Sequence, residues 1–191
     1  IVWGSAWLIV LRISNSVIPK NDFRIQYFVG SAITALASLI ALIQVLSGVF
    51  SALLLQKMFL GNQPLLLVSP VNTLEIGLGT LAISGALWFY YWIRNANTIK
   101  SDTLWLGYVL IAGVGGTLIL AITSLSVSLY QVLVWFFGEP YNQKIAEHFA
   151  GIPLSLAVAS AGLMFWWYHK SLLPTNSERN DIQRTYEYLM A

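Results

Sequence analysis

The segment IQYFVGSAITALASLIALIQVLSGVFSALLLQ, residues 25–56, decides the fold class, because no charged side chain lies between Arg24 and Lys57. A helix needs about 20 apolar residues to cross the roughly 30 Å hydrocarbon core of a bilayer. A charged residue at the centre of such a helix costs about 2.5 to 3.5 kcal/mol on insertion scales. The segment therefore predicts a transmembrane helix.

Three further charge-free intervals follow, from Glu75 to Arg94, from Asp102 to Glu139 and from Glu147 to Lys170. Strands that face lipid would alternate polar and apolar residues, and no such alternation appears. We therefore expect an all-α integral membrane protein with four complete transmembrane helices. Their expected positions are near residues 28–55, 72–93, 104–136 and 149–169.

The composition of the 191-residue chain agrees with this class and excludes several functions. It is 57% hydrophobic and only 9% charged, whereas soluble domains carry about 25% charged residues. The absence of cysteine excludes a disulfide framework, a thiolate metal site and a cysteine nucleophile. A net charge of +2 is too small to suggest a nucleic-acid partner. No nucleotide loop, metal-ligand helix or nucleophile with its base is recognisable, so we expect no catalytic residue, no metal site and no enzymatic activity.

The third interval is too long for one straight span, since about 33 residues at 1.5 Å each reach about 50 Å. Gly113, Gly115 and Gly116 are the expected point of bending or of close helix approach. Pro153 lies in the expected first turn of the fourth helix, where its missing N–H costs little.

The distribution of Lys and Arg predicts the orientation. Loops 12–27, 94–103 and 170–187 hold eight of these cations, whereas the alternate loops hold only Lys57 and Lys144. Cytoplasmic loops carry the excess of positive charge. The first three loops are therefore expected to be cytoplasmic.

The two halves of the chain share a pattern at the ends of their second helices. LWFYYWIR, residues 87–94, lines up with LMFWWYHK, residues 163–170, at an offset of 76. Both halves are expected to begin on the cytoplasmic side, which predicts tandem parallel helical hairpins over residues 22–94 and 102–170. Residues 1–12 are expected to be the end of a partial transmembrane helix, and 171–191 a cytoplasmic linker with the start of a further helix.

The aromatic stretches ending in Arg94 and Lys170, followed by a polar linker and by RTYEYL at residues 184–189, suggest a relationship. Over residues 22–191 the chain resembles an uncharacterised bacterial family of multi-spanning membrane proteins built of repeated helix hairpins, a domain of unknown function. The resemblance implies an integral protein of the bacterial cytoplasmic (inner) membrane. It carries no activity or catalytic residues to transfer.

Aromatic residues cluster where the second and fourth predicted helices end, each just before a cation. Tryptophan and tyrosine are enriched at the headgroup level of membranes. We therefore predict that six residues anchor the helices at the interface: Trp88, Tyr91, Trp92, Trp166, Trp167 and Tyr168.

Glu75 is the candidate ion or proton site, because an ionisable group within a span is a functional suspect. Asn72-Thr73-Leu74-Glu75 also has the spacing of a capping box, in which the glutamate would lie in the first helical turn. The cap is the favoured interpretation.

His148 and His169 are the candidate cofactor-binding residues, since either could ligate a metal or the magnesium of a chlorophyll-type pigment. They cannot form one site, because 21 residues along one helix place them about 31 Å apart. Each adjoins a charged residue, Glu147 or Lys170, at a predicted interface. The favoured interpretation is therefore an interfacial histidine with water nearby.

Three functions remain open. The preferred hypothesis is a non-catalytic structural or accessory subunit of a larger membrane complex, with lipids and other integral membrane subunits as partners and no cofactor. The second is a transporter or channel module for a small solute or ion that uses hydroxyl groups of the third helix, with Glu75 at its mouth. Such hydroxyls, however, more often bond their own helix or a neighbour. The third is a pigment- or quinone-binding subunit of an energy-converting complex.

Overall fold

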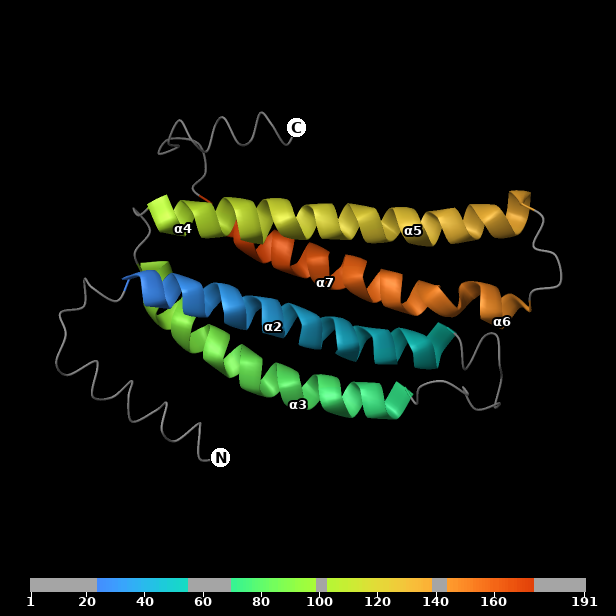
Figure 1. The fold of residues 1–191 in the computed structure, drawn as a ribbon, viewed down its shortest axis with the longest axis horizontal. Helices are drawn as coiled ribbons and strands as arrows, with labels where there is room; N and C mark the ends of the chain where they lie inside the picture. Colours follow the sequence, from blue (N-terminus) through green and yellow to red (C-terminus); the bar gives the residue numbers. More distant parts are fainter. Residues whose placement is uncertain (1–23, 55–69, 99–102, 139–143, 174–191) are drawn as a thin grey trace.

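The computed structural model describes residues 24–54, 70–98, 103–138 and 144–173, and these segments are helical for nearly their whole length (Figure 1). Four helices within them are long and apolar enough to cross a membrane, which confirms the all-helical class and the four predicted spans. They cover Ile25–Leu54, Val71–Thr98, Leu104–Phe137 and Ile145–Ser171. The predicted partial helix at 1–12 and the predicted further helix near the C-terminus lie outside the described residues.

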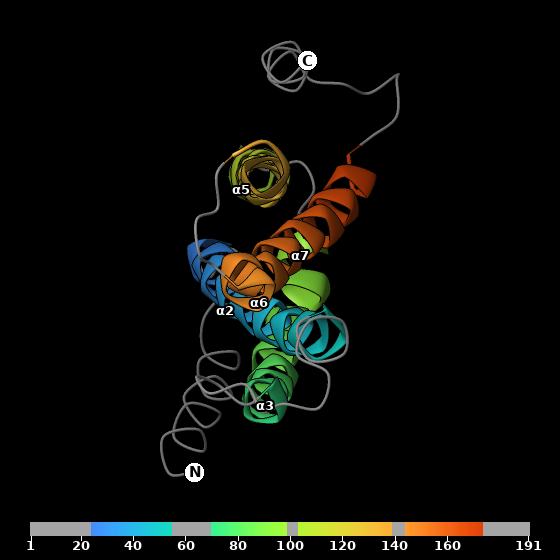
Figure 2. The same cartoon turned by 90° about the vertical axis from the view of Figure 1, so that its right-hand side faces the viewer.

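The long helices lie side by side in an order that differs from their order in the chain. They are α2 (Arg24–Phe50), α3 (Pro70–Trp88), α5 (Thr117–Phe137) and α7 (Ile152–Ser171). Helix α2 packs against α3 and α7, and α7 packs in turn against α5 (Figures 1 and 2). The middle of the row is therefore α2 and α7, and its edges are α3 and α5.

Three of the spans contain widened, π-helical turns, and in the first of them these are residues 51–54, after α2. Helix α3 continues into η2 (Phe89–Asn95) and the short η3 (Ala96–Thr98). Helix α4 (Thr103–Gly107) continues into η4 (Tyr108–Gly116) and then into α5. π-Helical turns are rare in proteins, and those that occur are often found at functional sites. The two longer π-helical segments, η2 and η4, lie at the same end of the molecule.

Gly113 of η4 makes the expected close helix approach. A Cβ atom at Gly113 would lie 2.5 Å from Cδ2 of His169 on α7, so only glycine allows this contact without a shift. Pro153 lies in the first turn of α7, as predicted. Helix α6 (Ile145–His148) and η5 (Phe149–Gly151) precede it within the same span.

Helix α3 begins at Pro70, two residues before the Asn72 that was expected to cap it. Proline is favoured in a first turn because its fixed φ angle suits the helix and its missing N–H would be unpaired there. Asn72 and Glu75 consequently lie inside the helix. The helix therefore does not begin at the predicted capping box.

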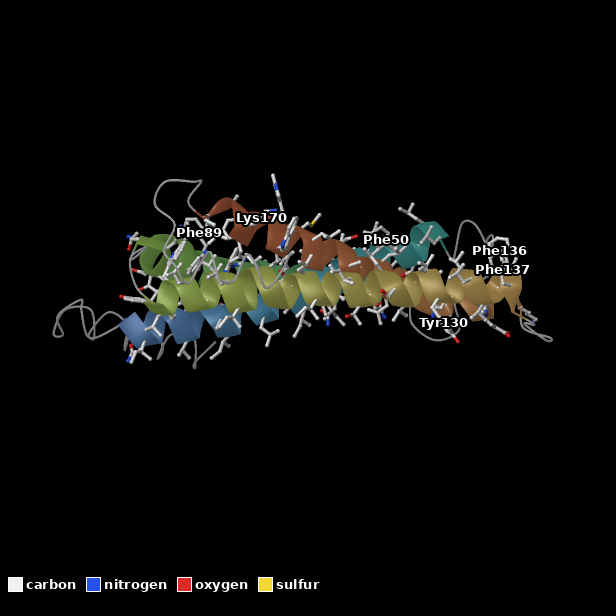
Figure 3. The ribbon with its side chains drawn as sticks, turned by 90° about the horizontal axis from the view of Figure 1, so that it is seen from above. Phe50, Phe89, Tyr130, Phe136, Phe137 and Lys170 are labelled. Carbon is white, nitrogen blue, oxygen red and sulfur yellow. The ribbon has the colours of Figure 1, made fainter. Side chains whose placement is uncertain are left out.

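The buried core is aromatic and lies at the end that holds η2 and η4. Its members come from three of the spans, with smaller residues between the rings, and include Phe28, Trp92, Ala96, Trp105, Tyr108, Val109 and Val114. Elsewhere the outer faces carry exposed apolar side chains such as Phe137, which is 85% exposed (Figure 3). An apolar exterior of this extent is expected where lipid is the solvent.

Candidate functional site

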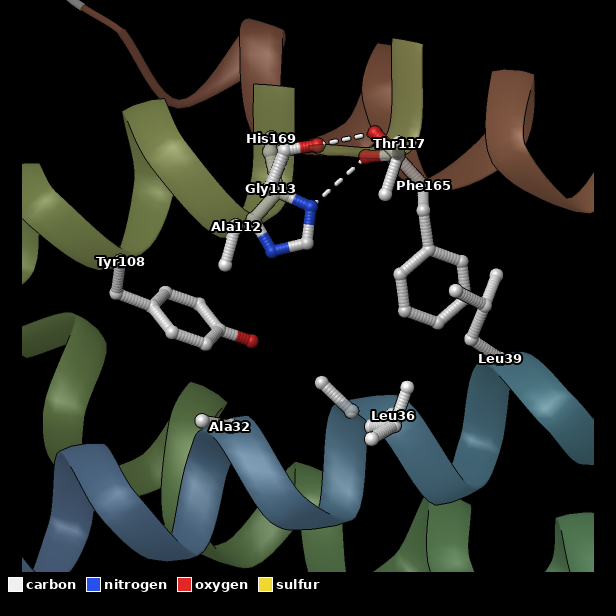
Figure 4. A pocket seen from close by; sticks show the side chains of 10 residues that line it. Ala32, Leu36, Leu39, Tyr108, Ala112, Gly113, Thr117, Phe165 and His169 are labelled. Carbon is white, nitrogen blue, oxygen red and sulfur yellow. Dashed lines mark hydrogen bonds between the residues drawn. The ribbon is translucent and has the colours of Figure 1, made fainter. Parts of the chain in front are cut away.

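His169 lies in the aromatic core, and only 1% of its surface is exposed. Its Nδ1 atom lies 2.8 Å from the backbone oxygen of Phe165, one turn earlier in α7 (Figure 4). A carbonyl oxygen can only accept, so Nδ1 carries the proton and donates it. In the neutral ring Nε2 then bears a lone pair. Nε2 is buried and has no hydrogen-bond partner among the described residues.

Two features hold the His169 ring in this orientation. Gly113 of η4 leaves room for it, because a side chain there would overlap the ring. Aromatic rings surround it at 5.0 to 6.2 Å between centroids, and they come from α3, η2, η4 and α7: Trp88, Trp92, Tyr108, Phe165 and Tyr168. The imidazole is therefore fixed by packing and by one backbone hydrogen bond.

The hydrogen bonds around this histidine are made between aromatic side chains. The indole nitrogen of Trp88 donates to the hydroxyl of Tyr108 at 3.1 Å. The indole nitrogen of Trp92 donates to the hydroxyl of Tyr168 at 3.0 Å. Buried tryptophan and tyrosine normally find such partners. The polar atoms of these four side chains are thus paired, in contrast to Nε2 of His169.

A cavity of about 110 Å³ lies beside His169, between α2, η4 and α7 (Figure 4). Its lining is mostly apolar, with His169, Tyr108 and Thr117 as the polar side chains. The Thr117 hydroxyl donates to the backbone oxygen of Gly113. On the outer side the cavity is lined by Ala32, Leu36 and Ala112, which are exposed on the surface of the spans. The cavity therefore opens toward the surroundings of the helices.

His169 lies in a more buried environment than expected, and the six predicted anchors differ widely in their exposure. His169 is buried among rings, because side chains of three other segments, α3, η2 and η4, cover it. Of the six aromatics, Trp92 is fully buried, Tyr91 is buried, and Trp88 and Tyr168 make the hydrogen bonds described above. Trp166 packs against the core and under the Lys170 ammonium, at 4.6 Å from the ring centroid. Trp167 is 72% exposed and is free to meet a headgroup region.

The other candidate residues lie away from this cavity. His148, in the short helix α6, donates through Nε2 to the backbone oxygen of Gln131 at 2.8 Å and packs against Trp135 and Phe149. Glu75 is exposed on α3. The structure thus keeps the two histidines in separate sites, as the spacing predicted. In the described part of the chain, no three His, Asp or Glu side chains converge on one point.

Hydroxyl groups of the third span bond to backbone oxygens one turn earlier, or to the neighbouring helix. Thr117 bonds to Gly113 and Ser126 to Ile122. Ser128 approaches Ser155 of α7 at 2.6 Å between hydroxyl oxygens. These contacts are the helix-packing role that such residues commonly have in membrane proteins.

Comparisons of the chain with protein-family models, with curated proteins and with solved structures find no match. The geometry around His169 could not be predicted from the sequence, because three of the rings that bury it lie 61 to 81 positions earlier in the chain. One sequence feature did indicate a close helix approach, namely Gly113 in a charge-free interval too long for one straight span.

Proposed function

We propose that the chain is a non-catalytic integral membrane subunit, a structural or accessory component of a larger membrane protein complex. The main observation that supports this proposal is the arrangement of the four long helices. The central helices α2 and α7 each pack against two neighbours, whereas α3 and α5 each have one main neighbour among the described helices. A neighbouring subunit against each edge helix would give it the same environment as the central ones.

The exposed side chains of the edge helices support this proposal. Ile83 on α3 is 69% exposed and Ile119 on α5 is 61% exposed. Apolar surfaces such as these can pack against other helices in lipid, where association depends on van der Waals fit more than on burial from water. The hydroxyl groups of α5 favour a packing role over a transport path, since they bond to backbone or to Ser155.

The proposal includes an arrangement in the bacterial inner membrane. Helices α2 and α3 form one hairpin, α5 and α7 a second, and both begin on the cytoplasmic side. The offset of 76 between the aromatic stretches, the eight-to-two distribution of cations and the family resemblance support this arrangement.

Site-specific photo-crosslinking in native membranes tests the proposal. A photoreactive amino acid is introduced at Ile83 or at Ile119, and separately at Ala157, which is fully buried within α7. We expect the two edge positions to form adducts with other polypeptides of defined mass, and Ala157 to form none. Adducts with lipid alone at both edge positions would contradict the proposal.

A further inference from the structure

We infer that the cavity beside His169 binds a lipid-soluble ligand with a hydroxylated aromatic ring, such as the head group of a quinol, and that a ligand hydroxyl donates to Nε2 of His169. This binding site goes beyond the proposed structural role and does not depend on it.

The hydrogen-bonding state of His169 defines the ligand chemistry. Nδ1 is committed to the backbone oxygen of Phe165, so Nε2 is left as an acceptor. Nε2 is buried and unpaired, and its aromatic neighbours are paired with one another. A buried acceptor without a donor is unfavourable. Four other buried side-chain atoms of the described residues also lack a partner, but none of them belongs to a residue that lines this cavity. A ligand hydroxyl would supply the missing donor.

The size of the cavity selects a single ring. Its volume is about 110 Å³, and an apolar cavity of about 150 Å³ binds benzene in a well-studied engineered case. One six-membered ring fits with a small adjustment of the lining. A tetrapyrrole pigment, with four linked pyrrole rings, does not fit. The observations therefore favour a quinol-type ring over a pigment held through an axial histidine.

The position of the cavity mouth indicates a ligand that arrives from the lipid. Ala32, Leu36 and Ala112 line the cavity and are exposed on membrane-spanning segments. A ring that enters between α2 and η4 would leave an attached hydrocarbon tail among the lipid chains. The mostly apolar lining would favour an aromatic ring over a charged solute.

One neighbouring side chain must move for the hydrogen bond to form, because the Nε2 atom of His169 is buried. Tyr108 lines the cavity and meets the His169 ring edge-on, at 5.5 Å between centroids. A rotation of the Tyr108 side chain, which would give up its hydrogen bond from Trp88, would open a path from the cavity to the imidazole. The ligand ring would then stay in the cavity, and its hydroxyl would reach Nε2 of His169.

Calorimetric titration of the purified protein in phosphatidylcholine nanodiscs tests the inference with two matched probes. The first is decylhydroquinone, and the second is its dimethyl ether, which keeps the ring and the tail but has no hydroxyl donor. We expect the hydroquinone to bind about tenfold more tightly than the ether, as one hydrogen bond to a buried acceptor implies. Equal affinities would overturn the inference.

The variants His169→Leu and His148→Leu form a matched pair, since His148 lies outside the cavity. We expect about tenfold weaker hydroquinone binding for His169→Leu and unchanged binding for His148→Leu. Equal losses in both variants, or none, would overturn the site.

A measurement on the unsubstituted protein keeps the inference testable if His169→Leu does not fold. The ¹⁵N resonance of Nε2 in His169 reports whether this atom accepts a hydrogen bond. We expect it to shift on addition of the hydroquinone and not on addition of the ether. An unchanged resonance at saturating hydroquinone would overturn the inference, as would hydroquinone-induced shifts confined to His148.

Discussion

Trp92 and Tyr168 occupy matching positions, 76 residues apart, in the two aromatic stretches of the sequence, and they contact each other directly. The indole nitrogen of Trp92 donates a 3.0 Å hydrogen bond to the Tyr168 hydroxyl. Trp92 is fully buried. The aromatic stretches therefore meet inside the protein, where they join the helices of the first half of the chain to those of the second.

The Trp92–Tyr168 hydrogen bond should contribute measurably to stability. We expect Trp92→Phe and Tyr168→Phe each to lower the free energy of unfolding, with a coupling of about 0.5 to 1.5 kcal/mol in the double-variant cycle. Unfolding by a denaturing detergent in mixed micelles measures these values. Trp167→Phe is the control, because the Trp167 side chain is mostly exposed. Strictly additive effects would show that the contact contributes nothing.

Gly113 should be required for the packing of His169. A Cβ atom there would lie 2.7 Å from the His169 Cβ atom, and overpacking of this kind typically costs about 1 to 3 kcal/mol. Gly79 has open space around it, so Gly79→Ala should not destabilise the protein. Thermal unfolding of the two alanine variants makes the comparison. A Gly113→Ala protein as stable as Gly79→Ala would contradict the described packing.

The Ser128–Ser155 contact should hold α5 against α7. Hydrogen bonds between membrane helices contribute about 0.6 kcal/mol on average, and we expect a coupling of that size between Ser128→Ala and Ser155→Ala. Ser126→Ala serves as the control, because Ser126 is exposed and bonds only to Ile122 of its own helix. The readout is again the free energy of unfolding in mixed micelles. A larger loss for Ser126→Ala than for Ser128→Ala would argue against the packing role.

The four spans could be predicted from the sequence because charged residues are excluded from the membrane centre whatever the helices pack against. The long third interval and its glycines likewise predicted a close approach, which Gly113 and His169 make. Both predictions depend on local properties of the chain.

The environment of His169 could not be predicted in the same way. Its neighbour Lys170 and its place near the end of a span are typical of an interface, and the rings that bury it are distant in the sequence. The same holds for Trp92, since an aromatic residue near a helix end is equally suited to a headgroup region and to a protein core. The π-helical turns of η2 and η4 have no recognised sequence signal here.

The predicted orientation can be tested with single cysteines, since the chain has none of its own. Thr98→Cys lies at the end of the second span, and Asn142→Cys lies between the third and fourth. We expect a membrane-impermeant reagent to label Thr98→Cys from the cytoplasmic side and Asn142→Cys from the opposite side of sealed vesicles. Labelling of both from one side would contradict the predicted topology.

The most direct test of the proposed subunit role is a density map of the native membrane complex purified through a tag on this chain. The account predicts transmembrane helices of other polypeptides packed against the outer faces of both α3 and α5. A map in which this chain stands alone, with only lipid or detergent along both edge helices, would contradict it.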